Sequence, residues 1–136
     1  MTDAEATTLL HQTMPLCATL GMRAERFTPE IVVLAMEWAE NLCTSNSMLH
    51  GGAVMALADS AGGASAFLNL PAGAAGTSTI ESKTNFLGAI RGGTVRATAR
   101  PLHVGGTTIV VETEVRSAED KLVAKVTQTQ IVLRAK

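Results

Sequence analysis

The chain of 136 residues is long enough to form a hydrophobic core, and we expect a single domain over residues 1–136. Its formal net charge of −1 and its few aromatic residues (three Phe, one Trp and no Tyr) exclude the basic face and the stacking platforms typical of nucleic-acid-binding proteins. The first ten residues, MTDAEATTLL, carry an acid where a secretory signal would need bases, which predicts a cytoplasmic protein.

Three elements are predicted before the middle of the chain. Residues 3–14 have the apolar spacing of a short amphipathic helix, which Pro15 ends or interrupts. Residues 21–27 and 31–39 are rich in strand-forming residues and are separated by a Thr-Pro-Glu turn signal, so they predict a β-hairpin. The polar residues 41–47 predict a loop.

The most informative segment begins at His50-Gly51-Gly52 and continues as a predicted helix over residues 51–68. This helix is apolar nearly all round, and its only charge is Asp59. A carboxylate is costly to bury, so its presence here needs a reason. The N–H groups at a helix start lack partners within the helix and can bind an anion. An acid and an oxyanion site on one element favour hydrolytic chemistry.

Four more strands are predicted after the helix, separated by Gly- and Pro-rich turns. Their ranges are 77–86, 93–104, 107–116 and 122–133. The middle two are joined at Gly105-Gly106 as a tight hairpin. A helix that is apolar nearly all round must be covered, and a curved antiparallel sheet wrapped around it does this. The sequence therefore predicts an α+β fold with one long central helix.

Three motifs carry a resemblance to a known family. N-x-M-L-H-G-G-A-V-x-x-L-A-D-x-A begins at Asn46, and N-F-L-G-A-I-R-G-G and V-V-E-T-E-V follow it. Together they resemble the hotdog-fold acyl-CoA thioesterases, most closely the PaaI / 4-hydroxybenzoyl-CoA thioesterase group, over residues 20–133. The resemblance implies hydrolysis of an acyl-CoA or acyl-carrier thioester to an acid and a free thiol. It also implies a homodimer or homotetramer and no cofactor.

The resemblance implies a role for each matched residue. Gly51 would donate its backbone N–H to the thioester carbonyl, and Asp59 would be the catalytic carboxylate, acting as nucleophile or as general base. His50 would help to position the thioester or organise the loop. Gly52 and Thr79 would contact the substrate.

The chain departs from the family pattern at two positions. Many members carry Asn or Gln where this chain has Thr44, so Asn46 is the nearest amide that could serve instead. Many carry Ser or Thr where this chain has Gly63. Arg91 is the candidate for a contact with the CoA phosphates, although a basic residue on a solvated face is the alternative.

The spacing of the two central groups has a structural consequence. Gly51 and Asp59 are eight residues apart, which on a helix is a rise of about 12 Å. A reacting carbonyl must lie about 3 Å from both the oxyanion donor and the attacking group. One chain therefore cannot supply both, and we expect two antiparallel helices in a dimer to form two composite sites.

Several alternatives remain open from the residues alone. Asp59 could be a structural charge paired with a base on a strand, and His50 could simply cap the helix. The same fold could serve as a non-catalytic acyl-CoA-binding protein. Dehydratases of this fold resemble a His-Phe-Pro pattern that the chain lacks. A membrane span is disfavoured by the acid near its centre, and the scattered histidines predict no metal site.

Overall fold

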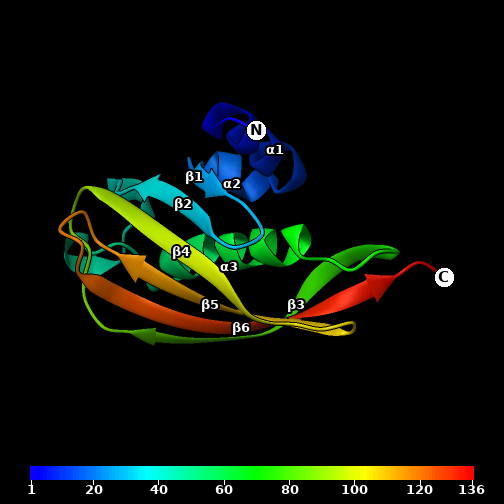
Figure 1. Ribbon diagram of the computed structural model, residues 1–136. Coiled ribbons are helices and arrows are strands. Elements are labelled where there is room, and N and C mark those ends of the chain that lie inside the picture. The colour runs from blue at the N-terminus through cyan, green and yellow to red at the C-terminus, as the bar shows by residue number, and fades with distance from the viewer.

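The computed structural model describes all residues, 1–136, as a curved sheet with helices on its inner side (Figure 1). The elements in chain order are α1 (Asp3–Thr13), α2 (Pro15–Thr19), β1 (Arg23–Phe27), β2 (Val32–Glu37), α3 (Gly51–Leu68), β3 (Ala74–Phe86), β4 (Thr94–Val104), β5 (Thr108–Arg116) and β6 (Leu122–Arg134). Two short 3-10 turns, Glu40–Leu42 and Ser45–Ser47, lie between β2 and α3. No helix combines the length and the apolarity that crossing a bilayer requires.

The six strands form one antiparallel sheet in the order β1-β2-β4-β5-β6-β3. The sheet curves around α3, and α1 and α2 lie beyond α3 at the β1 end (Figure 1). β3 leaves the end of α3 and pairs with β6 at the far edge of the sheet. This edge strand has 13 residues and pairs on one side only.

The core lies between α3 and the inner face of the sheet. Strand β5 shows why the chain folds this way, because Ile109, Val111, Thr113 and Val115 alternate with partly exposed residues and are fully buried. Half of the residues of α3 are buried beneath the sheet. Its buried residues are Val54, Leu57, Ala58, Ser60, Ala61, Gly62, Ala64, Ser65 and Ala66. The predicted fold class, a curved antiparallel sheet around one long helix, is therefore present.

The other side of α3 is left uncovered by its own chain. Gly52, Met55, Asp59 and Phe67 are exposed, and their spacing of three, four and eight residues places them on one face of the helix. We call these four residues the open stripe of α3. Phe67 is 52% exposed and Met55 is 38% exposed. The sheet therefore covers only part of a helix that was expected to be covered on most of its surface.

The interruption predicted at Pro15 is present, and the strand predicted after the central helix starts earlier than expected. Pro15 separates α1 from α2 and begins α2, because the first turn of a helix tolerates the missing N–H of proline. The strand predicted over residues 77–86 begins three residues earlier, at Ala74, where β3 pairs with the end of β6. Long-range pairing overrides the weak strand propensity of the Ala-Ala-Gly segment.

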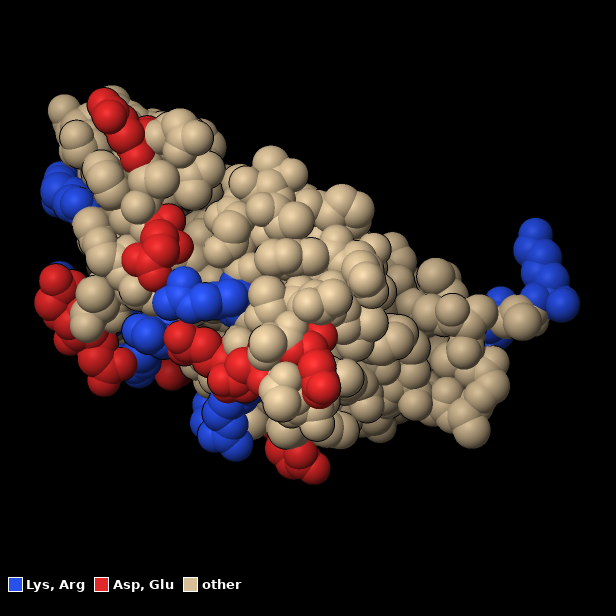
Figure 2. All heavy atoms as spheres, turned by 90° about the horizontal axis from the view of Figure 1, so that it is seen from above, with Lys and Arg blue, Asp and Glu red and all other residues tan.

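Charges of both signs are interspersed at one end of the molecule. Ion pairs join Arg23 to Glu37 and Arg96 to Glu25 across β1, β2 and β4. Seen from above, the charged side chains gather toward the left of the view, and most of the remaining face is uncharged (Figure 2). Because positive and negative groups alternate, this face has no large field of one sign.

Candidate active site

The start of α3 holds one backbone N–H that is free to bind a ligand. His50 is the N-cap residue, and its Nδ1 accepts a hydrogen bond of 2.7 Å from the Gly52 N–H. A neutral ring in this arrangement carries its proton on Nε2. The Gly51 N–H donates to no group of the chain. The N–H of Gly51, the predicted donor, is therefore available to an oxyanion, whereas the N–H of Gly52, a predicted substrate contact, is engaged by His50.

Close contacts explain the glycines at these two positions. A Cβ on Gly51 would lie 3.1 Å from Cζ of Phe86, at the end of β3. A Cβ on Gly52 would lie 2.9 Å from Nδ1 of His50, against the capping ring. His50 thus caps the helix through Nδ1, as one alternative predicted. Its Nε2 keeps a hydrogen that can be donated to another group.

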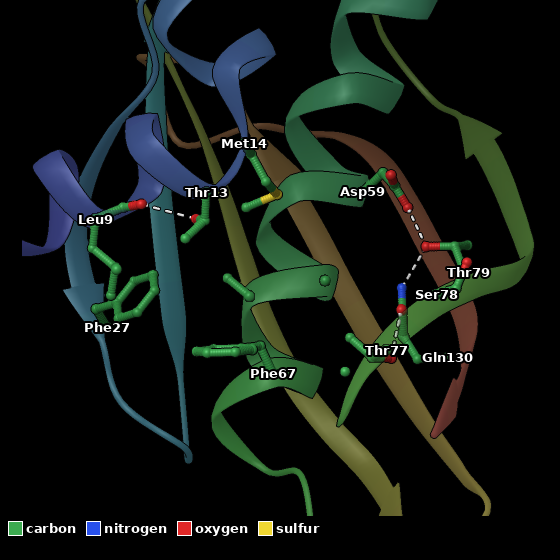
Figure 3. Close-up of a pocket in the computed structure, with 13 residues that line it drawn as sticks. Leu9, Thr13, Met14, Phe27, Asp59, Phe67, Thr77, Ser78, Thr79 and Gln130 are labelled. Carbon is green, nitrogen blue, oxygen red and sulfur yellow. Dashed lines mark hydrogen bonds between the residues drawn. The ribbon is translucent and has the colours of Figure 1, made fainter. Parts of the chain in front are cut away.

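Asp59 lies on the open stripe of α3, with two donors on one of its oxygens. The Thr79 hydroxyl, from β3, donates to Oδ1 at 2.9 Å (Figure 3). The Gln128 amide, from β6, donates to the same oxygen at 3.1 Å. Oδ2 has no hydrogen bond within the chain. The carboxylate is therefore oriented by two strands and keeps one oxygen free.

A further hydrogen bond sets the direction of the Thr79 hydroxyl. The Gln130 amide donates to Thr79 Oγ1, and Gln130 Oε1 accepts from the Thr77 hydroxyl at 3.0 Å (Figure 3). Because Thr79 Oγ1 accepts from Gln130, its own hydrogen points to Asp59. None of the ion pairs in the structure includes Asp59, so the alternative in which a strand base neutralises it is wrong.

A cavity of about 350 Å³ opens beside Asp59. Its polar end is formed by Asp59 and by residues of β3 and β6, and its other end is apolar (Figure 3). The apolar lining comes from α1, the α1–α2 junction, β1 and α3: Leu9, Met14, Phe27, Ala64 and Phe67. An acid at the mouth of an apolar slot suits a substrate with an apolar tail and a reactive polar head.

A second hollow, of about 580 Å³, lies in the loop that carries Arg91. Ser117, Glu119 and Lys121 line it together with Arg91. The Leu49 N–H donates to the carbonyl oxygen of Ile90 at 2.8 Å, which holds this loop beside the start of α3. Arg91 is therefore on the Gly51 side of the molecule.

Asn46 is not linked to the other candidates. It lies exposed in the turn Ser45–Ser47 with a φ of 62°, a left-handed conformation that asparagine adopts more readily than most residues. Its side chain forms no hydrogen bond with Gly51, Asp59 or any other group of the chain. The turn explains an asparagine here without a catalytic role.

Three residues of the candidate site were missed from the sequence: Lys121 and Gln130, which line the two hollows, and Gln128, which donates to Asp59. For the glutamines a signal existed. The Thr-Gln-Thr-Gln segment places both in phase with Val126 and Val132, which face the core. Two buried amides in an otherwise apolar inner face indicate a polar partner inside the fold.

The site is split along α3. The helix is continuous from Gly51 to Leu68, so the free N–H of Gly51 and the carboxylate of Asp59 are separated by a rise of about 12 Å.

Nowhere in the chain do three His, Cys, Asp or Glu side chains gather in a way that could hold a metal ion. The two cysteines are free thiols, and burial raises the pKa of Cys17.

Comparisons with known proteins identify the family and the fold of the chain. The family model described as the thioesterase superfamily matches residues 46–124. A protein of Bacillus subtilis provisionally named esterase ComA2 is 32% identical over 108 residues, which is 79% of this chain and 86% of that protein. The thioesterase HI1161 of Haemophilus influenzae superposes with a TM-score of 0.89 at 25% identity, over 98% of this chain and 92% of that one.

A variant of the thioesterase PA1618 of Pseudomonas aeruginosa has a TM-score of 0.87 at 27% identity, over 95% of this chain and 94% of that chain. These structural neighbours confirm the predicted hotdog fold, with its curved antiparallel sheet around a long helix. Because the family model covers more than half of the residues, the chain belongs to the thioesterase superfamily.

Proposed function

We propose that this protein hydrolyses acyl-CoA or acyl-carrier thioesters, as a PaaI-like member of its family. The observation that carries the proposal is the carboxylate of Asp59, which has one oxygen held by two donors and the other free at the mouth of an apolar cavity. The apolar part of the cavity suits the acyl group. A free-thiol assay with short, medium, long and aromatic acyl-CoA thioesters tests this, and no thiol release from any of them would contradict it.

The active unit in this proposal is a dimer with two composite sites. The open stripe of α3 and the one-sided edge strand β3 are both unpartnered surfaces beside Asp59. A second copy that packs its α3 antiparallel against the first brings Gly51 of one chain to Asp59 of the other. It also covers the exposed Met55, and a twofold axis makes both sites equivalent.

The chemistry requires both half-sites at one thioester. The carbonyl oxygen accepts the Gly51 N–H, which stabilises the negative charge that develops on that oxygen. In one route Asp59 Oδ2 attacks the carbonyl carbon, the C–S bond breaks, the thiolate leaves, and water then hydrolyses the resulting anhydride. In the other route Asp59 removes a proton from a water molecule that attacks the same carbon. Both routes give a carboxylic acid and a free thiol.

The Thr79 hydroxyl is expected to orient the reacting carboxylate. Replacing Thr79 by Val removes one donor from Asp59 Oδ1, and we expect kcat to fall about tenfold or more, because hydrogen bonds to charged groups are among the stronger ones. Thr79→Ser keeps the hydroxyl and is the matched control. Steady-state kinetics of the two variants check this. An equal loss of kcat in both variants would show that the hydroxyl does not orient Asp59.

Arg91 is proposed to bind the CoA phosphates. It lies exposed in the second hollow, next to Lys121 and beside the start of α3, where a nucleotide can rest while the thioester reaches Gly51. Arg91→Ala is expected to raise KM about fivefold and to leave kcat nearly unchanged, since an exposed ion pair contributes modest, uniform binding. Arg100→Ala, an exposed arginine on β4 without an ion pair, is the control. A loss mainly in kcat would exclude this role.

A non-catalytic acyl-CoA-binding protein is the second candidate. The absence of a side-chain hydroxyl at Gly63, which lines the cavity next to Asp59, favours it. Such a protein would bind a thioester tightly without releasing thiol. Binding and thiol release measured on the same acyl-CoA separate the two candidates.

A further inference from the structure

We propose that Gln128 is a positioning residue for Asp59, and that residue 62 is glycine because the Gln128 amide occupies the space a side chain would need. The inference rests on the proposed role of Asp59 as the reacting group. It explains the residue type at two positions, Gln128 on β6 and Gly62 on α3. It also identifies Oδ2 as the oxygen of Asp59 that reacts.

The Gln128 amide has only one orientation that fits its surroundings. The residue is fully buried, and its Nε2 lies 3.1 Å from Asp59 Oδ1. A carboxylate can only accept hydrogen bonds, so the amide must turn its nitrogen toward it. This leaves Gln128 Oε1 buried without a hydrogen-bond partner.

Stability alone does not explain a glutamine at this position. A buried carbonyl oxygen without a partner is destabilising, because it has given up its hydrogen bonds to water. Other inward positions on β6 carry Val126 and Val132, and an apolar residue at 128 would avoid that loss. The donor to Asp59 is what distinguishes glutamine from such a residue.

Gly62, on α3, lies directly against the side-chain amide of Gln128. A Cβ there would lie 1.9 Å from Oε1 of Gln128 and 2.3 Å from its Cδ, so any side chain would push the amide away. The backbone at Gly62 is ordinary α-helix, where alanine is the more stable residue. The adjacent Gly63 differs, since a Cβ there meets nothing within 4 Å. The contact with Gln128 is therefore the specific reason for glycine at 62.

The two donors on Asp59 come from different strands. Thr79 lies on β3 and Gln128 on β6, and both donate a hydrogen bond to Oδ1. A carboxylate held at one oxygen by two groups cannot rotate without breaking both hydrogen bonds. Oδ2 is then presented toward the substrate in one geometry, which supports attack or proton transfer from a fixed position.

Kinetics of Gln128→Met test the positioning role. Methionine is similar in length but lacks the donor, so we expect kcat to fall about tenfold to a hundredfold with KM changed little, the effect of a misplaced reacting group. Val126→Ala, on the same face of β6, is the control for loss of core packing. It should lower the unfolding temperature without that loss of kcat. A Gln128→Met variant with kcat near that of the wild type would overturn the inference.

A double-mutant cycle tests the link between Gly62 and Gln128 without any substrate. Gly62→Ala alone should lower the unfolding temperature, because the amide is displaced. In a Gln128→Ala background the same change should raise the unfolding temperature, since alanine then fits and favours the helix. Equal effects of Gly62→Ala in both backgrounds would overturn the assignment of Gly62.

Thioester hydrolysis and the positioning of Asp59 by Gln128 can be disproved separately. If the wild type releases no thiol, the proposed function fails, while the unfolding cycle still decides the contact between Gly62 and Gln128. If the wild type is active and Asp59→Asn is inactive but Gln128→Met is normal, only the positioning inference fails.

Discussion

Replacing Asp59 by Asn is expected to lower kcat for thioester hydrolysis by about 10²- to 10⁴-fold, the contribution typical of a positioned acid or base. Asparagine has nearly the same shape, and its carbonyl oxygen can still accept from Thr79 and Gln128. It can neither attack a carbonyl nor remove a proton from water. Binding of a non-hydrolysable acyl-CoA analogue should therefore change little, and titration calorimetry beside steady-state kinetics measures both quantities.

The matched control for this variant is Asp120→Asn. Asp120 is an exposed turn residue with a φ of 62°, a conformation that asparagine also accepts. This substitution therefore removes the same charge from a residue that does not line the cavity beside Asp59. This control should keep wild-type kcat. Near-normal turnover by Asp59→Asn would remove Asp59 from the reaction.

Replacing Met55 by Glu is expected to separate the dimer and abolish most of the activity. Met55 lies midway between Gly51 and Asp59 on the open stripe of α3, so an antiparallel partner places it against the partner's Met55. Two glutamates facing each other at the axis would repel, and like-charge contacts in an interface are strongly unfavourable. Analytical ultracentrifugation should show monomers, and kcat/KM should fall because each Asp59 loses the Gly51 of its partner.

Leu102→Glu is the control for an added surface charge. Leu102 is 59% exposed on β4, away from the open stripe, so this variant should remain dimeric and active. A Met55→Glu protein that stays dimeric, or a monomer with wild-type activity, would contradict the composite site.

Local signals in the sequence were enough to locate the elements. The predicted central helix, 51–68, matches α3, because the capping histidine, the glycines and the proline at 71 all mark its ends locally. The last three strands agree with their predicted ranges within one residue. The position of β3 could not be read in the same way. Its pairing with β6 at the far edge depends on contacts between residues some fifty positions apart, which no local pattern encodes.

In the candidate site, too, local features could be predicted and contacts between distant residues could not. The free N–H of Gly51 follows from its place at a helix start, and the separation from Asp59 follows from helical rise. The donors from β6 could not be assigned to Asp59, because that requires the register of β6 beneath α3. Asn46 shows the opposite error: its residue type suggested an amide for the site, but the turn conformation accounts for it.

The composite site, the central claim, is tested most directly by mixing two inactive variants. Gly51→Pro removes the N–H of the oxyanion donor at the first helical position, where proline is well tolerated. Asp59→Asn removes the carboxylate. Each homodimer should be inactive. Circular dichroism and thermal unfolding establish that Gly51→Pro is folded, because its ring must fit beside Phe86.

Co-refolding the two variants in equal amounts decides whether the site is shared. A mixed dimer contains one intact site, in which Gly51 comes from one chain and Asp59 from the other. With random pairing, half of the dimers are mixed, so activity should return to about one quarter of the wild-type value. Activity no higher than the sum of the two parent variants would contradict a site built from two chains.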